Sequence, residues 1–476
     1  MRYINKNDII SILSYSGQMM EVIGIMCLLP IVFEFISLEF NVMGYVIAGL
    51  ISFTFGILFD KGFSKYRKRM RLKHAMIVSA FIWMWASIIG GVALCLVTNL
   101  DYLSCVFENM SALTGTGITM FRNVESLPLS VLFFRSFEQW IGGLGVIILV
   151  IGVMTRPGTA TAKLYQSEAR EERLEPSIKS TLKKTFHIYL IYTVGGIILY
   201  LIAGMPLFDS INASFTSIST GGMSIKNANM GFYHNDWIYL ITIILMILGA
   251  TSFTAHYRII KTRGMSLIKD LQFQIMLIIV AIGFILITTI YHFIPIETLF
   301  TVVSAITTTG ASVEPDKIFN AWPIFPLIVI MTFMLIGGSS GSTVGSIKLL
   351  RVIMFFKGVY KHLKEIMSPE GRVMVIKISN HIIPTKAVTE SGTYITLFMV
   401  FVLIGWALFC AFGYDPFKSL FGIVSLQGNN GLELGIINFD LHWFLKIVSI
   451  FHMWIGRLEI FPVLVLLKTC FEVLKI

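Results

Sequence analysis

The sequence predicts an all-α polytopic membrane protein, in which four pseudo-symmetric helix–pore helix–helix repeats surround one central pore and two extra transmembrane helices precede them. Three observations predict this fold. Of the 476 residues, 55% are hydrophobic and only 13% are charged, whereas a soluble protein carries about a quarter charged residues. Most apolar residues lie in runs long enough to cross a bilayer as helices. A long–short–long pattern of apolar segments then recurs four times, and internal repetition is typical of membrane transporters.

The placement of charge and cysteine narrows the function classes. The net charge is +10, but Lys and Arg cluster in short loops between apolar runs, as they do in cytoplasmic loops of membrane proteins. We therefore expect the lipid bilayer, and no nucleic acid, as a partner. The five cysteines are scattered, which predicts neither a disulfide framework nor a metal site. Residues 1–8 do not match a cleavable signal peptide.

Two apolar runs, near residues 14–38 and 42–59, come first and are followed by a basic loop. We assign residues 1–73 to this N-terminal transmembrane pair with its cytoplasmic loop. The four pore repeats that follow are assigned to residues 74–183, 184–269, 270–387 and 388–476. Their long spans lie near residues 74–98 and 127–154, 186–203 and 237–256, 271–293 and 322–349, and 392–412 and 443–467.

The short member of each repeat has about 11 to 13 residues, too few to cross a bilayer, and suits a re-entrant half-helix. A non-helical return from mid-membrane is tolerated only where it lines a watery cavity or is buried in protein. The four stretches that contain these segments hold eleven acidic and only four basic residues. Because Lys and Arg favour the cytoplasm, we expect these stretches outside and both termini inside. Acidic groups at the outer mouth would attract cations.

Each short segment ends in a string in which a small hydroxyl residue stands six positions before a glycine. The four strings are Ser111-Ala-Leu-Thr-Gly-Thr-Gly117, Thr216-Ser-Ile-Ser-Thr-Gly-Gly222, Ser304-Ala-Ile-Thr-Thr-Thr-Gly310 and Ser425-Leu-Gln-Gly-Asn-Asn-Gly431. One such string alone is an ordinary Gly-Thr-rich turn. Four strings at one offset, each between a half-helix and a full span, predict a shared structure.

That structure is a selectivity filter for a small monovalent cation, most simply potassium. A dehydrated cation needs replacement oxygens, and main-chain carbonyls supply them without a full charge, so the ion binds and can also leave. Glycine permits the backbone dihedrals that an inward-facing carbonyl ladder requires. The partly negative C-terminal end of each short helix points at the cavity and favours a cation there.

A glycine- and serine-rich stretch, residues 337–348, interrupts the last span of the third repeat. Its spacing does not fit a phosphate-binding loop, and no strand precedes it. It is either a broken helix whose flexible middle gates the pore beneath the filter, or a close packing site for small residues. We favour the gate.

A charged residue inside a transmembrane span is energetically costly, so each one is a candidate functional residue. Arg457 lies within the last span, either in the pathway as an electrostatic barrier or paired with Glu459 or Glu138, and both readings stay open. For Arg135 and Glu138 we expect a structural ion pair near the outer end of their span. No clustered acid, base or nucleophile indicates an enzyme.

At these residues the sequence resembles the TrkH branch of the Trk/Ktr/HKT superfamily of potassium transporters. The carriers are the four strings, residues 139–145 (Gln-Trp-Ile-Gly-Gly-Leu-Gly), residues 337–343 and residues 456–461 (Gly-Arg-Leu-Glu-Ile-Phe). The two extra N-terminal spans are also similar to this branch.

The resemblance implies a homodimer in the plasma (inner) membrane that transports K⁺, docks a cytoplasmic TrkA-like ring of nucleotide-binding regulatory subunits, and carries no organic cofactor. It implies Gly117, Gly222, Gly310 and Gly431 as filter glycines. The ion-binding carbonyls would come from Gly115, Thr116, Thr220, Gly221, Thr308, Thr309, Asn429 and Asn430. The gate would be formed by Gly337, Gly338, Ser339, Ser340, Gly341, Ser342 and Thr343, and Arg457 would be the pore arginine.

The fourth string departs from the family, which more often shows Pro-Gly-Leu-Gly after its last glycine. Here Glu433 follows and would place a carboxylate at the outer mouth. Gly117 favours potassium, because serine at that position accompanies sodium preference in the plant-type relatives. The leading hypothesis is a potassium-conducting uptake pore gated by a cytoplasmic partner. The alternative is a solute/cation secondary transporter with alternating access, against which the four repeats argue, since two inverted halves would be expected.

Overall fold

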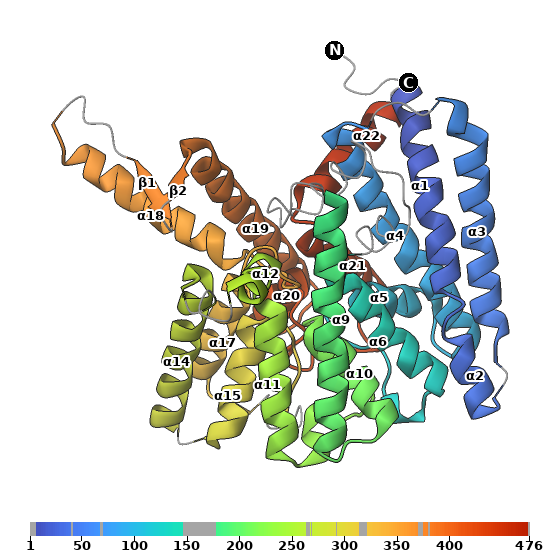
Figure 1. Ribbon diagram of the computed structural model, residues 1–476, viewed down its shortest axis with the longest axis horizontal. Helices are drawn as coiled ribbons and strands as arrows, with labels where there is room; N and C mark the ends of the chain where they lie inside the picture. The colour runs from blue at the N-terminus through green and yellow to red at the C-terminus, as the bar shows by residue number, and fades with distance from the viewer. Residues whose placement is uncertain are drawn as a thin grey trace.

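The structure is a computed structural model that describes residues 6–39, 41–66, 70–145, 178–262, 267, 269–291, 293–313, 321–369, 375–378 and 381–474. Within these residues it is helical apart from one antiparallel hairpin, β1 (Ile376–Ile378) with β2 (His381–Ile383), in which Lys377 faces Ile382. The N-terminal pair consists of α1 (Lys6–Met26) with its short continuation α2 (Ile31–Ser37), and α3 (Met43–Phe63). The predicted all-α membrane fold is confirmed (Figure 1).

The long–short–long pattern is visible as helices. The first set is α4 (Leu72–Val97), α5 (Tyr102–Thr114) and α6 (Leu129–Leu144), and the second is α9 (Ile178–Ile202), α10 (Leu207–Ile218) and α11 (Asp236–Ala250). The third is α14 (Leu271–Tyr291), α15 (Pro295–Ile306) and α17 (Ile324–Ile336), and the fourth is α19 (Thr385–Ala411), α20 (Pro416–Gly428) and α21 (Trp443–Arg457). Single 3₁₀ turns lie at Ser64–Tyr66, Val124–Ser126 and Asn229–Tyr233.

The short helices pack in a closed order. Helix α10 contacts α6 of the preceding set, α15 contacts α11, α20 contacts α17, and α5 contacts α21 of the last set. The core lies where these helices end, and every residue of α5 from Ser104 to Thr114 is buried. The cyclic packing therefore brings the C-terminal ends of the four short helices into one central region.

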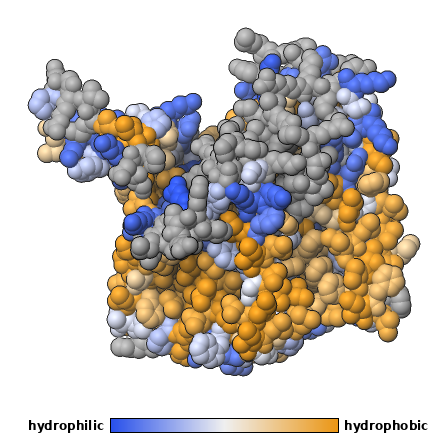
Figure 2. All heavy atoms as spheres, viewed as in Figure 1, coloured by the Kyte–Doolittle hydropathy of each residue, from blue (hydrophilic) through white to orange (hydrophobic). Residues whose placement is uncertain are grey.

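Among the described residues, six helices are long and apolar enough to cross a membrane, and a seventh crossing results if α21 and the helix after it count as one. Figure 2 shows a broad apolar band around the viewed face, with hydrophilic residues above and below it. This distribution matches a chain that is solvated by lipid at its middle.

The last helix of each set stops at a break, whereas the sequence predicted a break in the third set alone. Helix α6 ends before Gly145, and residues 146–154 of its predicted span lie outside the described residues. Helix α11 ends at Ala250 and is followed by α12 (Phe253–Thr262). Helix α17 ends at Ile336 and is followed, after the 337–348 segment, by α18 (Leu349–Ile366).

The predicted continuous span near residues 443–467 is wrong. Helix α21 ends at Arg457, and α22 (Phe461–Leu474) leaves at an angle of 119°. At the bend, Glu459 and Ile460 have left-handed φ angles of 57° and 65°, which are rare for residues other than glycine. Both oxygens of Glu459 are held by cations of the third set, Lys348 at 2.6 Å and Arg351. The bend therefore depends on a tertiary ion cluster.

Candidate functional site

The short helices begin with capping residues that set their direction. Asp101 accepts a hydrogen bond from Ser104 N (3.0 Å), and Asp415 accepts one from Lys418 N (2.8 Å), as N-cap residues do. Partial burial disfavours the carboxylate of Asp101, but the Ser104 hydrogen bonds and the nearby Lys446 ammonium outweigh it and lower the Asp101 pKa. Proline starts the other two helices or precedes them, which suits a first turn. Acidic residues lie at the N-terminal ends of the short helices, and the partly negative C-terminal ends of these helices point at the central region.

The four strings share one backbone conformation. The φ angles of the closing glycines are 87° at Gly117, 69° at Gly222, 73° at Gly310 and 102° at Gly431. Two positions earlier, φ is again positive, at 74° for Gly115, 53° for Thr220, 50° for Thr308 and 51° for Asn429. A β-branched threonine in this region is strained and persists only where its surroundings hold it. The same alternation in four places shows that the strings are equivalent in structure as well as in sequence.

Each string is tied to its own helix by the residue that stands six positions before the glycine. The carbonyls of Ser111, Thr216, Ser304 and Ser425 accept from Thr116 N (2.9 Å), Gly221 N (2.8 Å), Thr309 N (2.9 Å) and Asn430 N (2.9 Å). The side chains of Ser111 and Ser304 also donate to the carbonyls that follow the glycine, Ile118 O at 2.6 Å and Ala311 O at 2.7 Å. The recurring hydroxyl residue is thus a tether for the string.

The strings touch one another in cyclic order. A Cβ atom added to a closing glycine would collide with a main-chain carbonyl of the next string: Gly117 with Gly221 O, Gly222 with Thr309 O, Gly310 with Asn430 O, and Gly431 with Thr116 O. The contacts run from the first string to the second, third and fourth and back to the first. The structure therefore brings all four predicted glycines together in one closed ring.

Side chains add further links between strings. Asn429 Nδ2 donates to Thr116 Oγ1 of the first string at 3.1 Å and to Met453 O at 2.9 Å, and Asn430 Nδ2 donates to Ala305 O at 2.9 Å. In the second string, Gly221 O accepts from Gln139 of α6 at 2.6 Å. Glu433, expected at the outer mouth, is half-buried and accepts from Gly435 N within its own turn at 2.7 Å.

The 337–348 segment lies against the inner end of this ring. The hydroxyls of Thr343 and Thr220 are 2.9 Å apart, and Gly345 N donates to Thr308 Oγ1 at 3.2 Å. Ser346 Oγ donates to Gly428 O at 3.2 Å. The segment also joins the second set, because Ser339 N donates to Ala250 O at 3.0 Å. It therefore contacts the strings of three different repeats.

Arg457, the last residue of α21 in the fourth repeat, contacts the same 337–348 segment. Its guanidinium donates to Thr343 O at 2.6 Å, to Gly143 O at 3.2 Å and to Gly142 O. Its Cζ atom lies 5.6 Å from the centre of the Trp83 ring. Of the alternatives left open for Arg457, pairing with Glu459 is not found, since Lys348 and Arg351 hold that carboxylate, and no ion pair joins Arg457 to Glu138 within the described residues. Arg457 instead links the 337–348 segment to the break at the end of α6.

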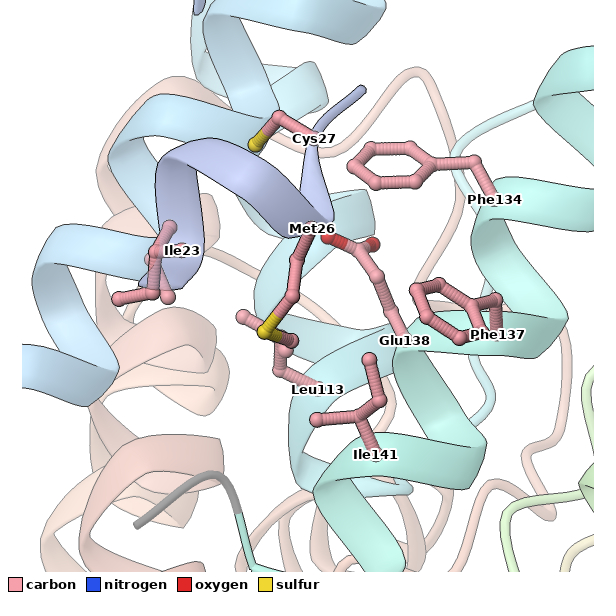
Figure 3. Close-up of a pocket in the computed structure, with 9 residues that line it drawn as sticks. Ile23, Met26, Cys27, Leu113, Phe134, Phe137, Glu138 and Ile141 are labelled. Carbon is pink, nitrogen blue, oxygen red and sulfur yellow. The ribbon is translucent and has the colours of Figure 1, made fainter. Parts of the chain in front are cut away.

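The predicted Arg135–Glu138 pair is wrong as well. Arg135 Nε lies 2.7 Å from Glu108 Oε1, and both side chains are buried. The carboxylate of Glu138 points away into an apolar pocket between α1, α5 and α6, beside Met26 and Phe137 (Figure 3). Its Oε2 atom has no hydrogen-bond partner within the described part of the chain. The ion pair joins residues 27 positions apart, so local spacing could not reveal it.

Comparison with known proteins gives a consistent result. The sequence profile of the TrkH family, described as cation transport protein, matches residues 41–295 and 294–472. A cation transporter of Methanocaldococcus jannaschii is 36% identical over 470 residues, which cover 98% of this chain and 97% of that protein. The Trk system potassium uptake protein TrkH of Salmonella typhimurium is 30% identical over 78% of this chain and 80% of its own length.

The crystal structure of the potassium transporter TrkH from Vibrio parahaemolyticus superposes with a TM-score of 0.86 at 25% identity, covering 96% of this chain and 98% of that one. The profile, the relatives and the solved structure all extend over most of the chain. The chain therefore belongs to the TrkH family of cation transport proteins.

Proposed function

We propose that the chain conducts dehydrated potassium ions across the plasma membrane through a filter formed by the four strings. The single observation that carries this proposal is the closed ring in which each left-handed glycine abuts a carbonyl of the next string. A ring of main-chain oxygens replaces the hydration shell of a monovalent cation. The coordinating carbonyls are those of Gly115, Thr116, Thr220, Gly221, Thr308, Thr309, Asn429 and Asn430.

Potassium is favoured among monovalent cations on two grounds. The Salmonella relative is described as a potassium uptake protein, and the solved relative as a potassium transporter. Gly117 also leaves the first string without a side chain where a Cβ atom would meet Gly221 O. An inside-negative potential would supply about 2.3 kcal/mol per cation for each 100 mV.

The gate in this proposal is the stretch from Gly337 to Thr343, with Arg457 as an electrostatic barrier beneath the filter. The contacts of Thr343 with both Thr220 and Arg457 support it, because they link this stretch to the second string and to a positive charge. Opening then requires the segment and the guanidinium to move apart.

We propose that both termini are cytoplasmic, and that the partners are a second copy of the chain and a cytoplasmic nucleotide-binding ring. The basic helix α18 and the β hairpin project from the body at the end where α1 begins and α22 finishes (Figure 1), as expected for the positively charged inner side. Exposed apolar side chains on α18, such as Phe356 and Ile366, support docking of a protein partner there.

Cation flux into proteoliposomes that contain no organic solute tests the proposal. We expect potassium-gradient-driven rubidium uptake, lost in Gly310→Val because the new side chain would strike Asn430 O. Gly195→Val is the matched control, since an added Cβ there meets nothing within 4 Å. Flux that depends on a co-transported solute, or that survives in Gly310→Val, would favour an alternating-access transporter instead.

A further inference from the structure

One buried amide from the first repeat bridges the string of the second. Gln139, on α6, is fully buried. Its Nε2 atom donates to Gly221 O at 2.6 Å, and its Oε1 atom accepts from Met223 N at 3.0 Å. The side chain therefore binds one main-chain group on each side of Gly222. Like a neighbouring β-strand, it offers one donor and one acceptor.

The second string has its main-chain tether to Thr216 O but lacks the side-chain tether that the other three strings have. In the first and third strings the hydroxyls of Ser111 and Ser304 donate to the residue after the glycine. In the fourth, Ser425 Oγ accepts from Gly431 N at 3.0 Å. The hydroxyl of Thr216 donates instead to Ala213 O within α10, at 3.3 Å. Gln139 thus occupies the role that a serine fills elsewhere.

The carbonyl that Gln139 binds belongs to the ring. Gly221 O is the atom that an added Cβ on Gly117 would strike, so its direction affects the first string as well as the second. A carbonyl oxygen has two lone pairs, and a donor on one of them leaves the other for an ion. An added Cβ on Gly221 would itself collide with the Gln139 amide, so the contact is close on both sides.

We infer that Gln139 is a positioning residue of the filter, which fixes the direction of the Gly221 carbonyl and thereby sets potassium-over-sodium selectivity. This inference rests on the proposed function. Both ends of the amide are required. Leucine would remove the donor and the acceptor together, whereas glutamate would keep the acceptor for Met223 N and place a carboxylate oxygen against Gly221 O. Selectivity depends on the number and arrangement of coordinating oxygens, so both variants should relax it.

The test compares the potassium-to-sodium permeability ratio of Gln139→Leu and Gln139→Glu with that of the native protein in the same proteoliposome assay. We expect the ratio to fall about tenfold, the factor that corresponds to the loss of one hydrogen bond of ordinary strength. The ratio does not depend on how much protein folds, and the near-isosteric glutamate keeps the volume of the site if leucine disturbs it.

Thr193→Val is the matched control. Thr193 Oγ1 accepts from Trp140 Nε1 at 2.9 Å, so this variant also breaks a buried hydrogen bond of α6, one residue away and without contact to the ring. Its ratio should equal the native one. A native protein that discriminates between the ions while both Gln139 variants keep its ratio would overturn the inference and leave the proposed function standing. A native protein without potassium flux would overturn the proposed function itself.

Discussion

The closing glycines of the ring and Gly341, in the middle of the 337–348 segment beneath it, are packed in opposite ways. A Cβ atom on Gly222 would strike Thr309 O of the next string and come within 2.7 Å of Ala311 N, which directly follows that string. On Gly341, which has a similar φ of 73°, the same atom would meet only Ser252 Cβ, at 4.0 Å. One string cannot shift without displacing its neighbour, whereas the middle of the segment has space to rearrange.

The hydrogen bonds of the two regions differ in the elements that they reach. Each string is anchored to its own short helix and to an adjacent repeat, as Asn430 is to Ser425 and Ala305. The segment is bound to other elements along its length. Ser340 N donates to Gln272 Oε1 at 2.8 Å, Gly341 O accepts from Phe253 N at 3.1 Å, and Thr343 contacts Thr220, Gly249 and Arg457. A filter must keep its oxygens in place while ions pass, and a gate must release. The tight packing of the closing glycines and the space at Gly341 are what the proposed filter and gate require.

Alanine substitutions at the two glycines give the largest expected difference. Gly222→Ala should lower potassium flux roughly a hundredfold, since strain at positive φ adds to a main-chain clash. Gly341→Ala bears the strain without the clash and should change flux by about threefold at most. Rubidium uptake per reconstituted protein measures both. Equal losses in the two variants would mean that the ring is no more constrained than the segment.

Gly117→Ser should come next. The serine Cβ would press on Gly221 O and displace one carbonyl of the ring without closing it. We expect the potassium-to-sodium permeability ratio to fall about tenfold, while total cation flux changes less. Reversal potentials in mixed-ion gradients report the ratio. An unchanged permeability ratio would mean that Gly117 is not part of the filter.

Arg457→Ala should have a smaller effect than Gly222→Ala or Gly117→Ser, and in the opposite direction. It removes the guanidinium bonds to Thr343 O and Gly143 O, so the segment should be released more often and basal flux should rise about fivefold. Arg457→Lys keeps the charge but loses the planar fork. A rise in basal flux in both variants would show that the lost hydrogen bonds cause the effect. A rise in Arg457→Ala alone would show that the lost charge causes it. Lower flux in Arg457→Ala would contradict a barrier role.

The sequence predicted the common conformation of the four strings better than the helices around them, for a physical reason. The strings recur at one offset, and their glycines have no alternative that fits the left-handed backbone, so local pattern and tertiary structure agree. The break at Gly337 was predictable in the same way. The bend at Glu459 was not, because it lies at residues with no intrinsic turn preference and depends on Lys348 and Arg351, more than a hundred residues earlier.

Side-chain partners were likewise beyond prediction. Arg135 and Glu138 stand one helical turn apart, which suggested a pair, but α5 brings Glu108 into contact with Arg135. Gln139 was part of a recognisable motif without an assigned role, and only the fold shows that its amide meets Gly221. Spacing identifies groups on one face of one helix, whereas the identity of the opposing helix depends on the whole fold.

Ion density is the most direct measurement of the central claim. An experimental structure determined in rubidium, with the anomalous signal recorded, should show bound ions inside the membrane on the pseudo-four-fold axis. They should lie within coordination distance of carbonyls from all four strings. If the axis is empty of ions at high rubidium, or if the ions lie outside the circle of Gly117, Gly222, Gly310 and Gly431, the ring is a packing arrangement and not a filter.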